Sequence, residues 1–79
     1  MGRYYLFSKK VDEEQEVKIL SEMRALDNVK DVEITPDFAY LKVTTKDGEY
    51  SEVMSAAVNI CSRLAGVEIV FKRFAYEDL

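Results

Sequence analysis

The side chains most able to bind a metal ion form one cluster of oxygen-bearing residues, Asp12, Glu13 and Glu14, followed by Gln15. Carboxylates at this spacing suit a divalent cation better than a soft metal such as copper(I). The same residues also match a helix start, because an Asp followed three residues later by a Gln has the form of a capping box. The pattern favours the helix cap, and a diverged divalent-metal site using Asp12 and Glu14 is the alternative.

Other reactive groups are scarce, since Cys61 is the only cysteine and histidine is absent. A disulfide framework or a cysteine-built zinc finger needs at least two thiols. The usual general base near neutral pH is also missing. Cys61 lies between Val58 and Leu64 on an apolar stripe, where a free cysteine packs like a small hydrophobe. We therefore expect no catalytic residues and a protein that is not an enzyme.

The net charge and the lengths of the apolar runs limit the partners and the location that we expect. Fifteen acidic and eleven basic residues give a net charge of −4, which repels nucleic-acid phosphates and makes such a partner unexpected. No apolar run approaches the roughly 18 residues that span a bilayer, so we expect no membrane insertion. The N-terminal stretch lacks the apolar core of a signal peptide, which favours a cytoplasmic location. Residues 1–79 are expected to form a single domain.

Hydrophobic periodicity predicts the elements that position these residues. Residues 3–9 are rich in aromatic residues and are typical of a strand. Apolar side chains then recur at helical spacing from residue 12, and the Asp27-Asn28 pair ends this helix. Residues 29–35 and 38–45 alternate as two strands of a hairpin broken at Pro36-Asp37. The first helical stripe consists of Val17, Leu20, Met23 and Leu26, with Ile19 alongside.

A turn signal at residues 46–48 precedes a second helix, which Gly66 ends as its C-cap, and residues 67–74 form a last strand. The stripe of this helix consists of Met54, Ala57, Val58, Cys61, Leu64 and Ala65. The order βαββαβ predicts an α+β, ferredoxin-like fold, in which a four-stranded antiparallel sheet carries two helices on one face. One shared core is expected from Leu20, Met23, Ile34, Leu41, Met54, Ala57, Cys61, Ile69 and Phe71.

The other sheet face is left open in such a fold. Strand alternation predicts that this face carries Tyr4, Leu6, Tyr40, Lys42, Val70 and Lys72. An apolar patch with a charged rim is typical of a protein-protein surface, so we expect a protein partner or a homodimer there.

Two other uses of the fold are less favoured. Tyr4 and Tyr40 on adjacent strands resemble the base-stacking pair of RNA-binding domains, but the net charge opposes RNA. A small-molecule-sensing domain would need a glycine in the loop of residues 8–11, which has none.

Residues 26–32 (LDNVKDV) and 65–69 (AGVEI) resemble the corresponding turns of heavy-metal-associated domains, the small domains of metal chaperones and metal-transporting ATPases. The resemblance covers essentially the whole chain and implies the same ferredoxin-like fold. The family signature G-M-x-C-x-x-C would place its two metal-binding cysteines at Asp12 and Gln15, and its Gly and Met at Lys9 and Lys10.

With both thiols replaced, the resemblance implies a degenerate, non-catalytic interaction or regulatory domain accessory to metal transport. It would dock through its sheet face or its first loop and would need no cofactor. The alternative is a divalent-metal carrier of the zinc type, which would need further ligands beyond Asp12 and Gln15.

Overall fold

The structure, a computed structural model, describes residues 2–76. Its elements follow the predicted order βαββαβ. They are β1 (Gly2–Phe7), α1 (Glu13–Arg24), β2 (Val29–Ile34), β3 (Tyr40–Thr45), α2 (Ser51–Ala65) and β4 (Ile69–Ala75). Predicted and observed bounds differ by one to three residues at most ends. None of the described helices is long and apolar enough to cross a membrane.

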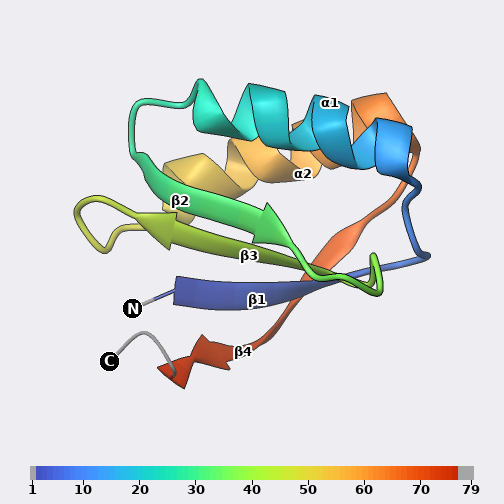
Figure 1. The fold of residues 1–79 in the computed structure, drawn as a ribbon. Coiled ribbons are helices and arrows are strands. Elements are labelled where there is room, and N and C mark those ends of the chain that lie inside the picture. Colours follow the sequence, from blue (N-terminus) through green and yellow to red (C-terminus); the bar gives the residue numbers. More distant parts are fainter. Residues whose placement is uncertain (1, 77–79) are drawn as a thin grey trace.

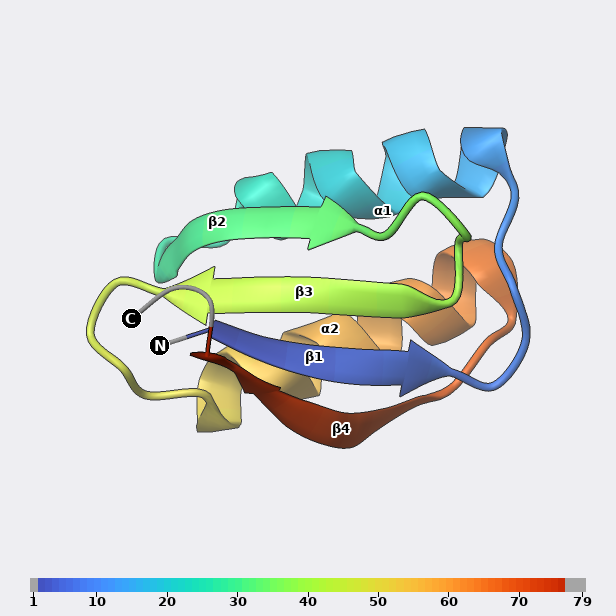
Figure 2. The same ribbon diagram turned by 60° about the horizontal axis from the view of Figure 1, so that its bottom comes forward.

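The strands form one antiparallel sheet in the order β2-β3-β1-β4. Both helices lie on the same face of this sheet (Figure 1). The opposite face is turned toward the viewer in Figure 2, with β2 and β4 at the two edges. The predicted α+β ferredoxin-like fold is therefore confirmed.

The start of α1 is the predicted capping box. Asp12 Oδ1 accepts a hydrogen bond from the Gln15 N–H at 2.8 Å, and Gln15 Oε1 accepts one from the Asp12 N–H at 3.0 Å. The helix buries Ile19 and Met23, which are one turn apart. Val17, predicted on this stripe, is 67% exposed. It comes two residues before the buried Ile19, and in a helix this spacing points the two side chains to nearly opposite sides.

Helix α2 ends at Gly66, which adopts the left-handed conformation with φ of 62° and donates its N–H back to the Ser62 carbonyl, as predicted. Val58, predicted on the buried stripe, is exposed instead. The buried face of α2 consists of Val53, Ala57, Ile60, Cys61 and Ala65.

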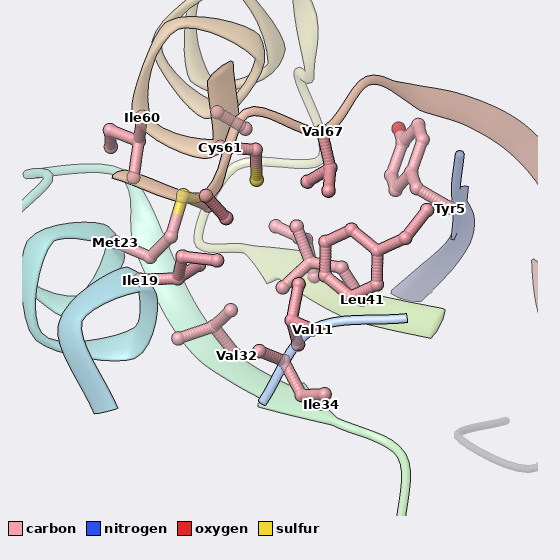
Figure 3. Packing of buried hydrophobic residues seen from close by; sticks show 14 of the residues in the cluster. Tyr5, Val11, Ile19, Met23, Val32, Ile34, Leu41, Ile60, Cys61 and Val67 are labelled. Carbon is pink, nitrogen blue, oxygen red and sulfur yellow. The ribbon is translucent and has the colours of Figure 1, made fainter. Parts of the chain in front are cut away.

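The core forms where both helices meet the sheet. Figure 3 shows Met23 of α1 and Cys61 of α2 pointing toward the layer that contains Val32 and Leu41. Val11, from the loop before α1, also packs into this cluster. Of the predicted core, Met23, Ile34, Leu41, Ala57 and Cys61 are buried, whereas Leu20, Met54 and Ile69 are partly buried against it. Phe71, also predicted there, is 49% exposed.

A β-bulge interrupts the regular alternation of β4. Tyr5 of β1 lies opposite Phe71, but the preceding Tyr4 lies opposite Arg73, so Lys72 is an extra residue in β4. Alternation therefore restarts after Lys72. Arg73, not Lys72, pairs with Tyr4 on the open face, and Phe74 shares the helix side with Phe71.

Candidate interaction surfaces

The cross-strand register places five of the six predicted residues on the open sheet face. Tyr4 pairs with Lys42, and Leu6 pairs with both Tyr40 and Val70. The sixth, Lys72, lies in the bulge and has no cross-strand partner, and Arg73 is the residue paired with Tyr4. The register therefore agrees with the predicted phases of β1 and β3 and with that of β4 up to Phe71.

The centre of this open face is occupied by a stack of rings and cations. The Arg73 guanidinium lies 4.1 Å from the centre of the Tyr4 ring, and the Lys42 ammonium lies 5.8 Å from it. Tyr40 meets Tyr4 edge-on at 6.4 Å between ring centres. A nucleic-acid base would have to displace Arg73 in order to stack on that side of Tyr4.

Lys42, predicted as part of an exposed rim, is only 9% exposed. Its ammonium lies 3.6 Å from a carboxylate oxygen of Glu33 on the neighbouring strand β2. Tyr4, Leu6 and Tyr40 are each half-buried, which leaves Val70 as the exposed apolar member of the predicted patch. The open face therefore offers little bare apolar surface among the described residues.

The positions that match the family's metal ligands serve the helix start. One side-chain oxygen of Asp12 and one of Gln15 accept the capping hydrogen bonds. Within residues 2–76, no three His, Cys, Asp or Glu side chains are grouped closely enough to hold a metal ion. Lys9 and Lys10 are exposed, so the loop places cations beside the capped helix start.

The first loop, the other predicted docking element, is tied to the fold at both ends. Ser8 exchanges two hydrogen bonds with Glu68, its N–H donating to the Glu68 carbonyl at 2.8 Å and its hydroxyl accepting from the Glu68 N–H at 2.9 Å. Val11 is buried at the other end. Within this loop, Lys9 and Lys10 are therefore the residues that remain available to contact a partner.

Cys61 is fully buried, and burial raises the pKa of its thiol from the ordinary value of 9.0 to about 11. A thiol with this pKa stays protonated at neutral pH, and the thiolate is the form that reacts or binds metals. Cys61 therefore packs as a hydrophobe, as the sequence predicted.

Most of the exposed large hydrophobic side chains among the described residues lie on β4 and the residue after it. We call Val70, Phe71, Phe74 and Tyr76 the β4 margin. Their exposed fractions are 58%, 49%, 37% and 62%, and among the described residues only Val17 and Val58 are large hydrophobics of comparable exposure. The rings of Phe71 and Phe74 lie 5.2 Å apart, and those of Phe74 and Tyr76 lie 6.1 Å apart. The three rings of the margin thus form a continuous row of contacts, and Val70 lies on the same edge strand but on the open face.

Arg3 joins this margin to the start of α2. Its guanidinium lies 4.1 Å from the centre of the Tyr50 ring, 5.5 Å from Phe74 and 5.9 Å from Phe71. The Tyr50 side chain is held by strand β3, because its hydroxyl donates a hydrogen bond to the Val43 carbonyl and accepts one from the Thr45 N–H. The Arg3 side chain is held by rings on two sides.

A hollow of about 360 Å³ opens beside this guanidinium. Desolvation raises the pKa of the Tyr5 hydroxyl at its floor, and a hydrogen bond from Arg3 partly opposes that shift. The hollow is lined by Arg3, Tyr5, Gly48, Glu49, Tyr50, Ser51, Met54 and Phe71. It is an amphipathic pocket, with aromatic walls, one cation and one carboxylate.

Sequence reasoning missed the β4 margin and its arginine. One signal was present: Phe71 and Phe74 are three residues apart, an odd spacing that would put them on opposite faces of a regular strand. Two aromatic residues at this spacing can both lie on the helix side only if the strand has a bulge between them. The contact of Arg3 with Tyr50 spans 47 residues of sequence and has no local signature.

Comparisons of the chain with protein-family models, with curated proteins and with solved structures found no match. Function is therefore argued from the surfaces described above.

Proposed function

We propose that this chain is a non-catalytic interaction domain that docks a partner protein along the β4 margin. The observation that carries the proposal is the gathering of four large exposed apolar side chains on one edge of the sheet. Contiguous exposed apolar surface costs free energy in water, and on a folded domain it commonly marks a contact site. Aromatic residues and arginine, which make up most of this surface, are the types enriched at interface centres.

The opposite edge of the sheet, strand β2, differs from β4 in the kind of side chain that it exposes. Strand β2 turns Val29, Val32 and Ile34 inward. Its exposed positions are charged, namely Lys30, Asp31 and Glu33. Charged side chains on an edge strand discourage pairing with another chain. Among the described strands, only β4 combines an edge position with exposed apolar side chains, which favours it as the docking edge.

The resemblance to heavy-metal-associated domains suggests the setting, an accessory domain in metal transport. The capping contacts of Asp12 and Gln15 support a role for these residues in the fold, and they favour docking over metal carriage as the retained function.

A display library of short extended peptides tests the proposal. Peptides selected on the wild-type chain should bind Phe71→Ser at least about tenfold more weakly, because an aromatic anchor at an interface centre contributes 1–2 kcal/mol or more. Val17→Ser is the control, since Val17 is also a large apolar residue exposed on the surface but lies on α1. Its affinity should equal that of the wild type.

A third variant, Tyr40→Ser, separates the two candidate surfaces, because Tyr40 lies on the open face and away from the margin. Loss of binding in Tyr40→Ser with full binding in Phe71→Ser would assign docking to the open sheet face. Selection of no peptide, or equal loss in Val17→Ser, would contradict a specific dock on either surface.

A further inference from the structure

The partner's chemistry can be taken one step further, on the assumption that the β4 margin is a dock. We propose that its occupant is an acidic segment in extended conformation, which pairs with β4 as a fifth strand of the sheet. This occupant is supported by the free strand edge, by the cations that flank it and by the poor fit of a second copy.

The backbone of β4 is available for pairing. Strand β4 ends the described sheet, so it hydrogen-bonds to β1 on one side only. An edge strand presents a row of N–H and C=O groups to which an extended peptide can add. Figure 2 shows β4 running along the outer border of the sheet, with no described element beside it on that side.

Three cations surround this edge on both faces of the sheet. Arg73 pairs across from Tyr4 on the open face, and Arg3 lies against Phe71 and Phe74 on the helix side. Lys72, at the bulge between them, is exposed. Within residues 2–76, none of these three cations forms an ion pair with a carboxylate.

The three cations make this edge locally positive, although the chain as a whole has a net charge of −4. Side chains of an added strand would alternate between the two faces of the sheet. Acidic residues on either face would therefore meet a cation, Arg73 on the open side or Arg3 on the helix side. In the register that points the acidic residues to the open side, the apolar residues between them lie on the helix side, where they would pack on the rings of Phe71 and Phe74.

A second copy of this chain fits the same edge poorly. Antiparallel self-pairing of β4 about its central residue brings Lys72 of one copy opposite Lys72 of the other, with the two Arg73 side chains one position away on either side. Like charges directly opposite one another destabilise a strand pair. The charge pattern thus selects a partner strand of opposite sign.

Three synthetic peptides test the inference by fluorescence anisotropy, one alternating glutamate with valine and two matched peptides with serine or lysine in place of glutamate. The glutamate peptide should bind most tightly, its affinity should fall as salt is added, and amide signals of β4 should shift in NMR spectra. In the double variant Lys72→Gln, Arg73→Gln the affinity should fall about five- to tenfold.

The control is the double variant Lys30→Gln, Lys46→Gln, which changes the net charge equally but alters the β2 edge and the turn before α2. It should bind as the wild type does. If the serine or lysine peptide binds as tightly as the glutamate peptide, the acidic partner is wrong while the margin remains a dock. If Phe71→Ser binds all peptides as the wild type does, the proposed dock itself fails.

Two further outcomes also overturn the inference. A wild-type dimer at low ionic strength that Phe71→Ser abolishes would make a second copy the occupant. Shifts confined to the open face around Tyr40 would place the peptide on the sheet surface instead of the strand edge.

Discussion

Asp12 shows how one residue can be tested for two roles. If it caps α1, Asp12→Ala should lower the free energy of unfolding by about 0.5–2 kcal/mol, because the Gln15 N–H loses its acceptor. Asp12→Asn should be nearly neutral, since asparagine caps equally well. Urea denaturation with and without zinc provides the measurement.

The metal alternative gives a different pattern in the same experiment. A ligand that binds only the folded state raises its stability by mass action. Micromolar zinc that stabilises the wild-type chain but not Asp12→Asn would therefore identify Asp12 as a metal ligand and would contradict the capping role alone.

Cys61 makes stability depend on alkaline pH. Its pKa in the folded chain is raised to about 11, so between pH 9 and 11 the unfolded state loses the thiol proton while the folded state keeps it. Stability must then fall as pH rises, by at most about 2–3 kcal/mol across this window.

Denaturant curves at stepped pH measure the effect of Cys61. Cys61→Ala should start less stable but show a flatter decline, with the remaining slope due to groups such as Tyr5, whose pKa burial also raises. An equally steep decline in Cys61→Ala would show that the thiol does not carry the pH dependence.

At the scale of single elements, the bulge in β4 predicts that one residue can be removed. Tyr4 and Tyr5 are consecutive, but their partners Arg73 and Phe71 are separated by Lys72. Deleting Lys72 makes the partners consecutive too, so both halves of β4 keep their register and faces. We expect the deletion variant to remain folded, with a change in unfolding free energy within about 1 kcal/mol.

Deleting Val70 instead is the control for the Lys72 deletion. It shifts the residues before the bulge by one position relative to Leu6 and Phe7 and turns their side chains to the opposite face. Thermal unfolding should show a large loss for this variant. Equal losses in both deletions would contradict the bulge as described.

How far the sequence predicts this molecule varies from one element to another. The capping box at Asp12 and the glycine C-cap at Gly66 are local hydrogen-bond patterns, and both were predicted correctly. Strand phase follows alternation and was right wherever the strand is regular, as in β1 and β3. Alternation did not anticipate the bulge at Lys72, because the bulge is set by pairing with β1 and not by β4 alone.

The candidate site was less predictable than the fold for a related reason. Burial of Lys42 beneath the open face depends on Glu33 and Tyr4, which come from two other strands. The clustering of Arg3 with Tyr50 likewise arises only when β1 is placed beside the start of α2. Contacts of this kind follow from tertiary packing, which no local residue pattern encodes.

At the scale of the whole molecule, charge decides whether copies associate. Each copy carries a net charge of −4, and antiparallel self-pairing of β4 about its centre would also place Lys72 opposite Lys72. The apolar margin favours association, whereas both electrostatic terms oppose it. Because added salt screens charges but not apolar contacts, we expect a monomer at low ionic strength and weak association through the margin at high salt.

Sedimentation velocity across a salt series measures this balance. Phe71→Ser should remain monomeric at every salt concentration, because it removes the apolar contact while leaving the charges unchanged, and Val17→Ser should follow the wild type. A dimer that is stable at low salt and dissociates as salt is added would mean that surfaces of opposite charge hold the copies together. The acidic first turn of α1, with Glu13, Glu14 and Glu16, would then be the surface to test against the cations of β4.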